Sequence, residues 1–295
     1  MVQTPLTREA VVEFSQQMPS FPRVVSEIIA TVDDPDGTLN VLVESINHDP
    51  LIAARVLAAA NRASSMARRE AAVDDIYAAT ARVGMSRVRE IALISSMNGF
   101  VQTLGSDERY RQLWLHSIAV AVAAQEIGLY IDRPVPLESA LIAGMLHNIG
   151  QYWFFAYAAG DYRECMDEAI SDSVALEVAE RRRFGVDHAQ VGAWLLAHWQ
   201  LPANICEAVN GHRAPEAHPG NVLVALIHVA EVVSDALDLA RSRESRVTHV
   251  SGAACNLLGM VWNADVHALF GRIEARSRHA NAFFDATSEV LPTSG

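Results

Sequence analysis

The second half of the chain holds histidine and acidic residues whose types suit metal binding or acid–base chemistry. Imidazoles and carboxylates that project from several helices of a bundle are common ligands of divalent metals in all-α proteins. A single histidine on a helix is more often a hydrogen-bonded core residue or a solvated one, so a structural role for each stays open. The residues that could form such a site are His116, His147, His188, His212, His228 and Glu231.

The elements that must position these side chains are predicted to be helices. Apolar residues recur at spacings of three and four between Leu42 and Leu57, which is typical of amphipathic helices. Asp49-Pro50 indicates an N-cap followed by proline at the first helical position, and it predicts a helix to about Arg62. No run of alternating apolar and polar residues with hairpin turns indicates strands. The sequence therefore predicts an all-α fold.

Helices in the second half are predicted to carry the histidines. One is expected from Pro136 to Gly150, and another over residues 162–184. Asp187 is expected to cap a following helix, and residues 222–239 form one more long apolar segment. The polar, turn-like residues 103–107 are interpreted as the boundary between two lobes, and residues 241–246 as a polar linker.

Composition excludes several classes of function. All 23 basic residues are Arg, so a P-loop lysine and a Schiff-base lysine are excluded. The formal charge of −12 disfavours nonspecific nucleic-acid binding. Three widely spaced cysteines indicate neither a disulfide scaffold nor a cysteine zinc site, and a cytoplasmic location is expected. The uncharged stretch 139–160 is long enough to span a bilayer, but its central His, Asn, Gly and Gln favour a buried helix with a polar site.

One segment has the length and central glycine of a helix-turn-helix. Residues 74–83 are followed by a turn at Gly84 and by a helix over 87–100. A recognition helix needs basic and amide side chains along its outer face. Here Arg87 and Arg89 are followed by a mostly apolar run, so packing in the core is favoured over DNA reading.

The order of these motifs resembles a known superfamily. His116, His147-Asn148 and Glu231 follow the H…HD…D order of the HD metal-dependent phosphohydrolases. Further blocks are similar to the HDOD family, the HD-related output domains, and they cover roughly residues 18–240. These blocks are residues 18–22, 34–36, 46–50, 53–57, 60–63, 74–79, 83–89, 187–193, 199–202 and 211–213.

The resemblance implies a two-lobed all-α protein. Its parts would be an N-terminal lead helix at 1–18, an N-terminal helical lobe at 19–106, an HD-like lobe at 107–240 and a C-terminal helical extension at 241–295. HDOD proteins are regarded as bacterial signalling modules, generally without demonstrated catalysis. The resemblance further implies that a degenerate HD site is formed by His116, His147, Asn148, Gln151, His188, His212 and Glu231.

The chain departs from the HD pattern where chemistry would occur. Asn148 replaces the metal-binding aspartate, and a neutral amide compensates a divalent charge poorly. Gln151 stands where many active relatives carry lysine, and Glu231 replaces the last aspartate. The second histidine of the His-His pair is Arg213. No cofactor is therefore expected, although His116, His147 and Glu231 could hold a single Fe, Mn or Zn ion.

We therefore predict a non-catalytic signal-transduction module that acts through protein–protein contacts. The expected partners are proteins of two-component or cyclic-dinucleotide pathways, and a homodimer is possible in principle. A residual phosphohydrolase of nucleotides or phosphoesters is one alternative, and a DNA-binding regulator is the second. Arginines that could contact anions, or else form solvated helix ends, are Arg87, Arg89, Arg181, Arg182 and Arg183.

Overall fold

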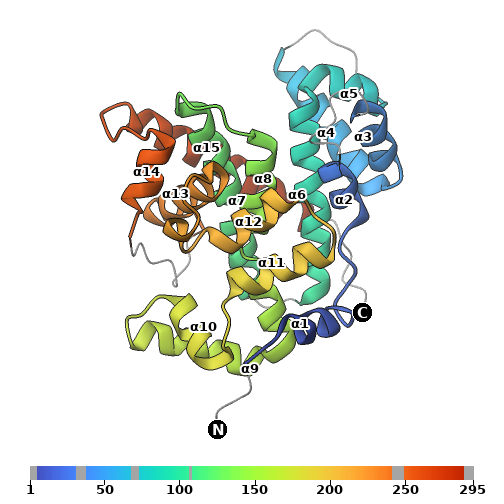
Figure 1. The fold of residues 1–295 in the computed structure, drawn as a ribbon. Coiled ribbons are helices and arrows are strands. Elements are labelled where there is room, and N and C mark those ends of the chain that lie inside the picture. The colour runs from blue at the N-terminus through green and yellow to red at the C-terminus, as the bar shows by residue number, and fades with distance from the viewer. Residues whose placement is uncertain (1–4, 31–37, 68–72, 106–107, 241–248, 289–295) are drawn as a thin grey trace. The chain divides into compact units, whose positions relative to one another are not determined.

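A computed structural model describes residues 5–30, 38–67, 73–105, 108–240 and 249–288 (Figure 1). Within these ranges the chain is helical, with helices α1–α15, one short 3₁₀ helix and no strand. The predicted all-α fold is confirmed. Two compact units are found, one comprising residues 20–103 and the other residues 1–19 together with 104–295.

The unit of residues 20–103 contains α2 (Arg23–Ala30), α3 (Thr38–Asn47), α4 (Pro50–Ala67), α5 (Ile76–Val83) and α6 (Met85–Leu104). Its helix ends follow local side-chain chemistry. The Asp49 carboxylate accepts the backbone N–H groups of Leu51 and Ile52 at 3.0 and 3.1 Å, which confirms the predicted N-cap. α4 runs beyond the expected end at Arg62 to Ala67.

The segment that could have been a helix-turn-helix consists of α5, Gly84 and α6. Gly84 has φ of +84°, a conformation that favours glycine, and it separates the two helices. All side chains from Val88 to Ser95 are buried, so α6 lacks the open polar face that a recognition helix needs. The structure therefore places residues 88–95, which would have to read DNA, in a packed core.

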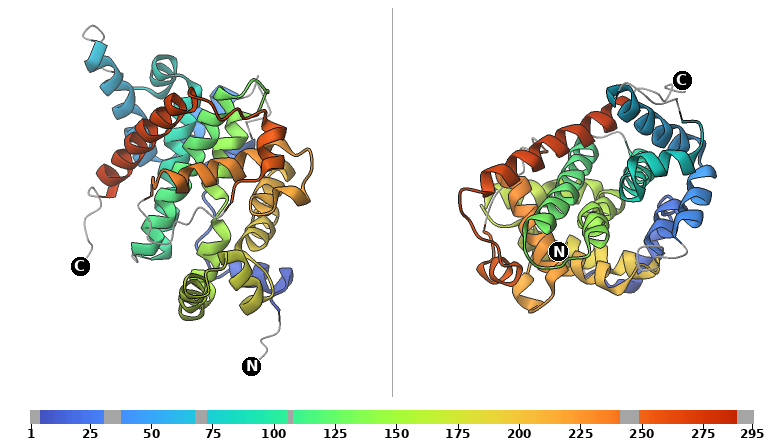
Figure 2. Two further views of the ribbon diagram at one scale, coloured as in Figure 1. Left: turned by 90° about the vertical axis from the view of Figure 1, so that its left-hand side faces the viewer. Right: turned by 90° about the horizontal axis from the view of Figure 1, so that it is seen from above.

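The second unit contains the helices that carry the histidines. They are α1 (Arg8–Ser15), α7 (Glu108–Tyr130), α8 (Leu137–Leu146), α9 (Ile149–Ser171), α10 (Leu176–Phe184), α11 (His188–His198), α12 (Ala203–Gly211), the 3₁₀ helix η1 (Pro215–Ala217), α13 (Val222–Ala236), α14 (Gly252–Leu258) and α15 (Val266–Ser288). Within this unit α7 packs against α8, α13 and α15 (Figure 2). At the contact with α8, a Cβ on Gly144 would lie 2.6 Å from the Cα of Ala121. Glycine therefore permits the close approach of these two helices.

The first and the last described helices, α1 and α15, both belong to this second unit. The indole of Trp153 donates to the Val11 carbonyl at 3.2 Å, which attaches α1 to α9. Arg272 and Arg276 on α15 pair with Glu126 on α7 at 2.9 and 2.8 Å. The linker expected at 241–246 lies outside the described residues.

Two predicted helix boundaries are wrong. The helix expected to end at Gly150 ends at Leu146, and a new helix begins at Ile149 after a break at His147 and Asn148. The helix expected over 162–184 is two helices, because Ser173 adopts φ of +54° in the turn between α9 and α10. At the first break buried residues continue on both sides and hide it, whereas the second break lies at the polar, exposed residues 171–173, a turn signal that the prediction passed over.

Among the described residues one helix, α7, has the length and composition of a membrane span. Of its most apolar window 67% is buried within the protein, which is also the behaviour of an ordinary core helix. The uncharged stretch 139–160 is divided between α8 and α9.

Candidate functional site

The site is built around the break between α8 and α9. His147 and Asn148 occupy this break and are buried, with exposed fractions of 0% and 2%. The Nδ1 atom of His147 lies 2.7 Å from the Gly144 carbonyl, so a neutral ring donates there and presents Nε2 as an acceptor. Nε2 lies 3.9 Å from Oε1 of Glu231 on α13.

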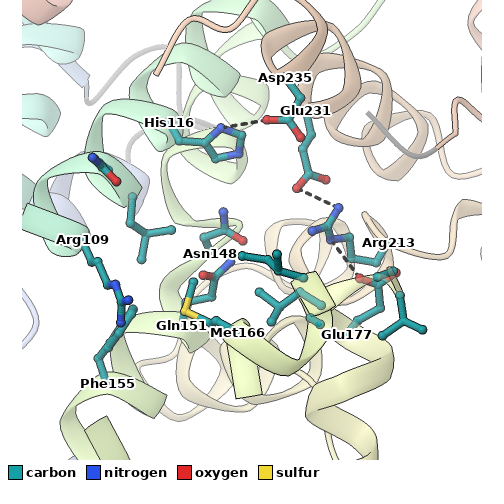
Figure 3. Close-up of a pocket in the computed structure, with 17 residues that line it drawn as sticks. Arg109, His116, Asn148, Gln151, Phe155, Met166, Glu177, Arg213, Glu231 and Asp235 are labelled. Atoms are coloured by element: carbon teal, nitrogen blue, oxygen red, sulfur yellow. Dashed lines mark ion pairs between the residues drawn. The ribbon is translucent and has the colours of Figure 1, made fainter. Parts of the chain in front are cut away.

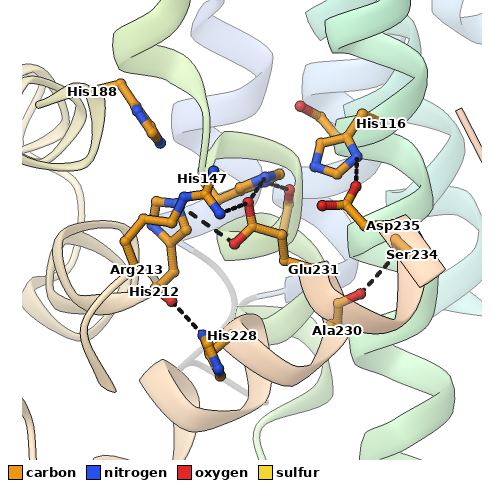
Figure 4. Close-up of polar contacts among 12 residues, drawn as sticks. His116, His147, His188, His212, Arg213, His228, Ala230, Glu231, Ser234 and Asp235 are labelled. Atoms are coloured by element: carbon orange, nitrogen blue, oxygen red, sulfur yellow. Dashed lines mark hydrogen bonds and ion pairs between the residues drawn. The ribbon is translucent and has the colours of Figure 1, made fainter. Parts of the chain in front are cut away.

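Three of the predicted residues converge at this point. One ligand atom from each of His116, His147 and Glu231 can be chosen so that all lie within 4.8 Å of one another. The three residues come from α7, the α8–α9 break and α13 (Figure 4). His116 Nδ1 also lies 3.4 Å from Oδ1 of Asp235, a residue that the sequence analysis did not identify.

His212 and His188 continue the cluster. Ring centroids are 5.2 Å apart between His147 and His212, and 5.5 Å apart between His212 and His188. His212 Nδ1 lies 2.6 Å from the Val209 carbonyl, whereas His188 Nδ1 lies 2.7 Å from the Glu180 carboxylate. Four imidazoles therefore follow one another from His116 to His188.

His228 has a structural role beside this row. The backbone N–H of Ser251 donates to its Nε2 at 3.0 Å, and its Nδ1 lies 2.8 Å from the His212 carbonyl. Both ring nitrogens therefore have backbone partners, and His228 holds the chain around α12, α13 and Ser251 together.

Arg213 is the important residue that sequence reasoning missed. Its Nη1 lies 3.3 Å from Oε1 of Glu231, and its Nε lies 3.7 Å from Oε2 of Glu177 (Figure 3). The Arg213 side chain is 24% exposed, whereas that of Glu231 is only 3% exposed. The sequence indicated only that a histidine was missing here, because Glu177 and Glu231 are distant in the chain. The structure shows that a permanent cation stands beside Glu231.

Burial and these charges set the protonation states of the site. Burial lowers the pKa of His147 and of His212 well below the ordinary histidine value. Burial would raise the pKa of Glu231, but the guanidinium of Arg213 outweighs it and the pKa is lowered. Burial likewise opposes the charge of Arg213, but Glu231 and Glu177 outweigh it and its pKa is raised. The site therefore combines neutral imidazoles with a charged Glu–Arg pair.

The donor set fits metal ions poorly. A two-ion centre needs several carboxylates. The positions of the HD pattern offer only Glu231 and the neutral amide of Asn148, and a further carboxylate beside them, Asp235, lies 3.4 Å from His116. Oε1 of Glu231 also faces Arg213. A divalent ion on that oxygen would lie roughly 4 Å from the guanidinium, where repulsion reaches about 8 kcal/mol at an effective dielectric constant of about 20. A single ion fits only if Arg213 moves away from Glu231.

A cavity of about 140 Å³ opens beside the site. Its polar wall includes His116, Asn148, Gln151, Arg213 and Glu231, which come from α7, the start of α9, the end of α12 and α13 (Figure 3). Its other wall is apolar and is formed largely by α9, the following turn and α10. The arrangement can therefore enclose a small molecule next to the degenerate HD residues.

The arginines considered for anion binding lie against carboxylates. Arg181 pairs with Asp187, the residue that caps α11, and Arg182 lies 3.8 Å from Asp172. Arg183 has three acidic neighbours, with Glu168 nearest at 2.6 Å.

The two candidate arginines on α6 also lie beside other groups or within the core. Arg87 lies 2.7 Å from Glu90, and Arg89 is 6% exposed. The structure therefore gives none of these five residues a free guanidinium.

A helical lobe that brings histidines and a carboxylate together at a break between two helices defines an HD-like protein. A family model of the HDOD domain matches residues 18–215. The chain belongs to the HDOD family, and the resemblance seen in its sequence is confirmed.

One curated relative is an uncharacterized protein of Treponema pallidum (strain Nichols). It is 25% identical over 223 residues, which are 74% of this chain and 43% of that protein. The chain therefore spans less than half the length of this relative.

Solved structures share the fold. An HDOD domain protein of unknown function from Geobacter sulfurreducens has a TM-score of 0.74 and 23% identity, with 94% of this chain and 97% of that chain covered. A protein from Marinobacter aquaeolei VT8 has a TM-score of 0.74 and 20% identity, with 98% and 62% covered. A protein from Shewanella amazonensis SB2B has a TM-score of 0.66 and 22% identity, with 93% and 96% covered.

Proposed function

We propose that this chain is a regulatory module of bacterial signal transduction that acts through contacts with other proteins and whose HD-like site is not catalytic. One observation carries the proposal: Arg213 lies 3.3 Å from Glu231, the carboxylate that would have to anchor a metal ion. A metal-activated water at neutral pH needs a fixed, open and charge-compensated metal site. Here the guanidinium of Arg213 pairs with the carboxylate of Glu231. Asn148 supplies a neutral amide at the position where the HD pattern has a second carboxylate.

The family supports a signalling role. HDOD domains are regarded as output modules, and the Marinobacter relative is described as a proposed signal-transduction protein. The partners of this chain are accordingly proteins of two-component or cyclic-dinucleotide pathways. The row of histidines then serves as a buried polar network inherited from an enzyme.

The test is a search for turnover that depends on the site. Purified protein is assayed with p-nitrophenyl phosphate and cyclic dinucleotides in Mn²⁺, Fe²⁺ or Mg²⁺, and we expect no phosphate or nucleotide release above background. His198→Ala is the matched control for His147→Ala, because His198 is an exposed histidine on α11. Turnover that survives His198→Ala but disappears in His147→Ala would show that the site is catalytic.

The convergence of His116, His147 and Glu231 within 4.8 Å favours a second candidate, a phosphohydrolase that acts with a single divalent ion. The Shewanella relative is described as a proposed phosphohydrolase. When bound, the ion would supply Lewis-acid activation of a water. Elemental analysis of protein purified without chelators or a His-tag column distinguishes the two candidates, since near-stoichiometric iron, manganese or zinc supports the hydrolase.

A further inference from the structure

The cavity beside the degenerate site has two chemically distinct walls. Its apolar wall includes Leu113, Phe155, Met166, Ile170 and Leu176. Phe155 and Met166 are buried, with exposed fractions of 4% and 6%, while Ile170 is 37% exposed. The cavity of about 140 Å³ is close in size to engineered apolar cavities that bind benzene. It can therefore hold the apolar body of a small molecule.

The polar wall contains a buried acceptor that lacks a partner. Oδ1 of Asn148 makes no hydrogen bond, and the residue is 2% exposed. Its amide points into the cavity between His116 and Gln151 (Figure 3). A buried carbonyl oxygen without a donor destabilises the protein by about 1–3 kcal/mol, so a ligand that donates to it gains affinity.

The charged groups around the cavity are already compensated. Arg213 lies against Glu231 and Glu177, and His116 lies against Asp235. Arg109, which also lines the cavity, is not free either. A charged head group would meet like charges as well as opposite ones, whereas a neutral donor can satisfy Asn148 without disturbing these pairs.

We propose that this cavity binds a small, uncharged amphiphile whose amide-like head hydrogen-bonds to Asn148 and whose apolar body packs against Phe155, Met166 and Leu176. An amide head offers both a donor and an acceptor, so it suits the side chain of Asn148 in either orientation of its amide group. The inference rests on the proposed function, because it gives the non-catalytic pocket a role as the receptor for a regulatory ligand.

Three probes of nearly equal shape test the charge preference of the cavity. Benzamide, benzoate and benzamidinium carry the same ring with a neutral, an anionic or a cationic planar head. Binding to the full chain is measured by ligand-observed NMR titration. We expect benzamide to bind with a Kd of about 1 mM, as befits so small a ligand, and both charged probes to bind about tenfold more weakly. Equal or tighter binding of a charged probe would overturn the proposal, as would no benzamide binding up to about 10 mM.

Two variants locate the bound probe. Asn148→Leu removes the acceptor and should weaken benzamide binding about tenfold, whereas Asn98→Leu changes an equally buried asparagine in the other unit and should not. Ala169→Phe fills the apolar side of the cavity and should abolish binding. Thermal melting verifies that each variant is folded. Benzamide binding that is unchanged in both cavity variants would place the probe elsewhere and contradict the assignment.

The outcome is separable from that of the proposed function. Phosphate release in the turnover assay would contradict the non-catalytic role whether or not benzamide binds. If benzamide does not bind and no turnover is found, the proposed ligand site is contradicted, whereas the proposed role in protein contacts is not.

Discussion

Arg213 and Asn148 decide, at the scale of single residues, what the site can do. A guanidinium remains charged at all accessible pH values, so Arg213 compensates Glu231 permanently. Unlike a metal ion, it offers no open coordination position for a water. Asn148 keeps the size of the aspartate that it replaces but removes its charge. In the function that we propose, these two side chains keep the polar cluster assembled while removing the means to activate water.

Reversing both substitutions should restore cation binding. Asn148→Asp alone adds one carboxylate, and we expect Mn²⁺ or Zn²⁺ to bind about tenfold more tightly than to the wild type. Adding Arg213→Met removes the competing cation and should tighten binding further. Without metal, the Arg213→Met variant leaves Glu231 uncompensated and should lose about 3–5 kcal/mol of stability. Isothermal titration and denaturant unfolding measure both effects.

The matched control for Asn148→Asp is Asn98→Asp, which adds a buried carboxylate in the other unit. It should not increase metal affinity. If the double variant binds metal no more tightly than Asn148→Asp alone, Arg213 is not what opposes the ion.

A site residue could be predicted from the sequence only where its order or spacing in the chain was informative. His116, His147 and Glu231 were selected by their order in a family pattern, and the structure brings them together. Asp235 lies one turn after Glu231 on α13, so its i, i+4 spacing was an available signal. Arg213 and Glu177 could not be paired from the sequence, because Glu177 on α10 and Arg213 after α12 are distant in the chain and only the folded arrangement brings them together. The family pattern predicts that Asn148 replaces a carboxylate, but its unpaired amide oxygen is visible only in the structure.

At the scale of elements, the position of His147 and Asn148 depends on how closely α9 approaches α11. Gly150 lies at the start of α9, where an added Cβ would overlap the carbonyl of His188. Gly160 lies after the kink that divides α9 at Ala158, and nothing stands within 4 Å of its Cβ position. The two glycines therefore test packing and helix propensity separately.

We expect opposite effects from the same substitution at these positions. Gly150→Ala forces α9 and α11 apart and should destabilise the protein by about 1–3 kcal/mol. Gly160→Ala should stabilise it by up to about 1 kcal/mol, because alanine favours helix. Denaturant unfolding of both variants checks the signs. Equal effects at the two positions would mean that the α9–α11 contact is looser than the structure shows.

Helix boundaries show which elements the sequence can define. The helix starts at Asp49 and Asp187 could be predicted, because a capping side chain marks each of them. Both carboxylates accept backbone N–H groups of the first turn. The breaks after Leu146 and Ser171 were not predicted, since buried residues continue through the first and a single positive φ, at Ser173, marks the second. The first boundary has no side-chain cap, and the second is closed locally by backbone hydrogen bonds from Asp172 to Glu168 and from Val174 to Ala169.

At the scale of the whole molecule, the buried histidines should make stability depend on pH. His147 and His212 are fully buried, and their lowered pKa keeps them neutral in the folded state. The titratable and charged groups around them are His116, His188, His228, Arg213 and Glu231. Glu231 favours protonation of His147, and the carbonyls of Gly144 and Val209 favour protonation of His147 and His212, but burial outweighs them. In the unfolded chain both histidines titrate near pH 6.5. Below that pH the unfolded state binds protons that the folded state does not.

Stability should therefore decrease as the pH falls from about 7 to about 5, by up to about 1.4 kcal/mol per pH unit for each of the two histidines. His188 contributes to the pH dependence of stability in the opposite direction. Burial opposes its charge, but Glu180 outweighs burial and raises its pKa, so its contribution is present at low pH and is lost as the pH rises through that raised value. Denaturant unfolding between pH 5 and pH 8 measures the net profile. The His147→Asn/His212→Asn double variant removes both neutral rings, so its free energy of unfolding should depend less on pH between pH 7 and pH 5. An unchanged pH dependence would show that other groups cause the loss of stability.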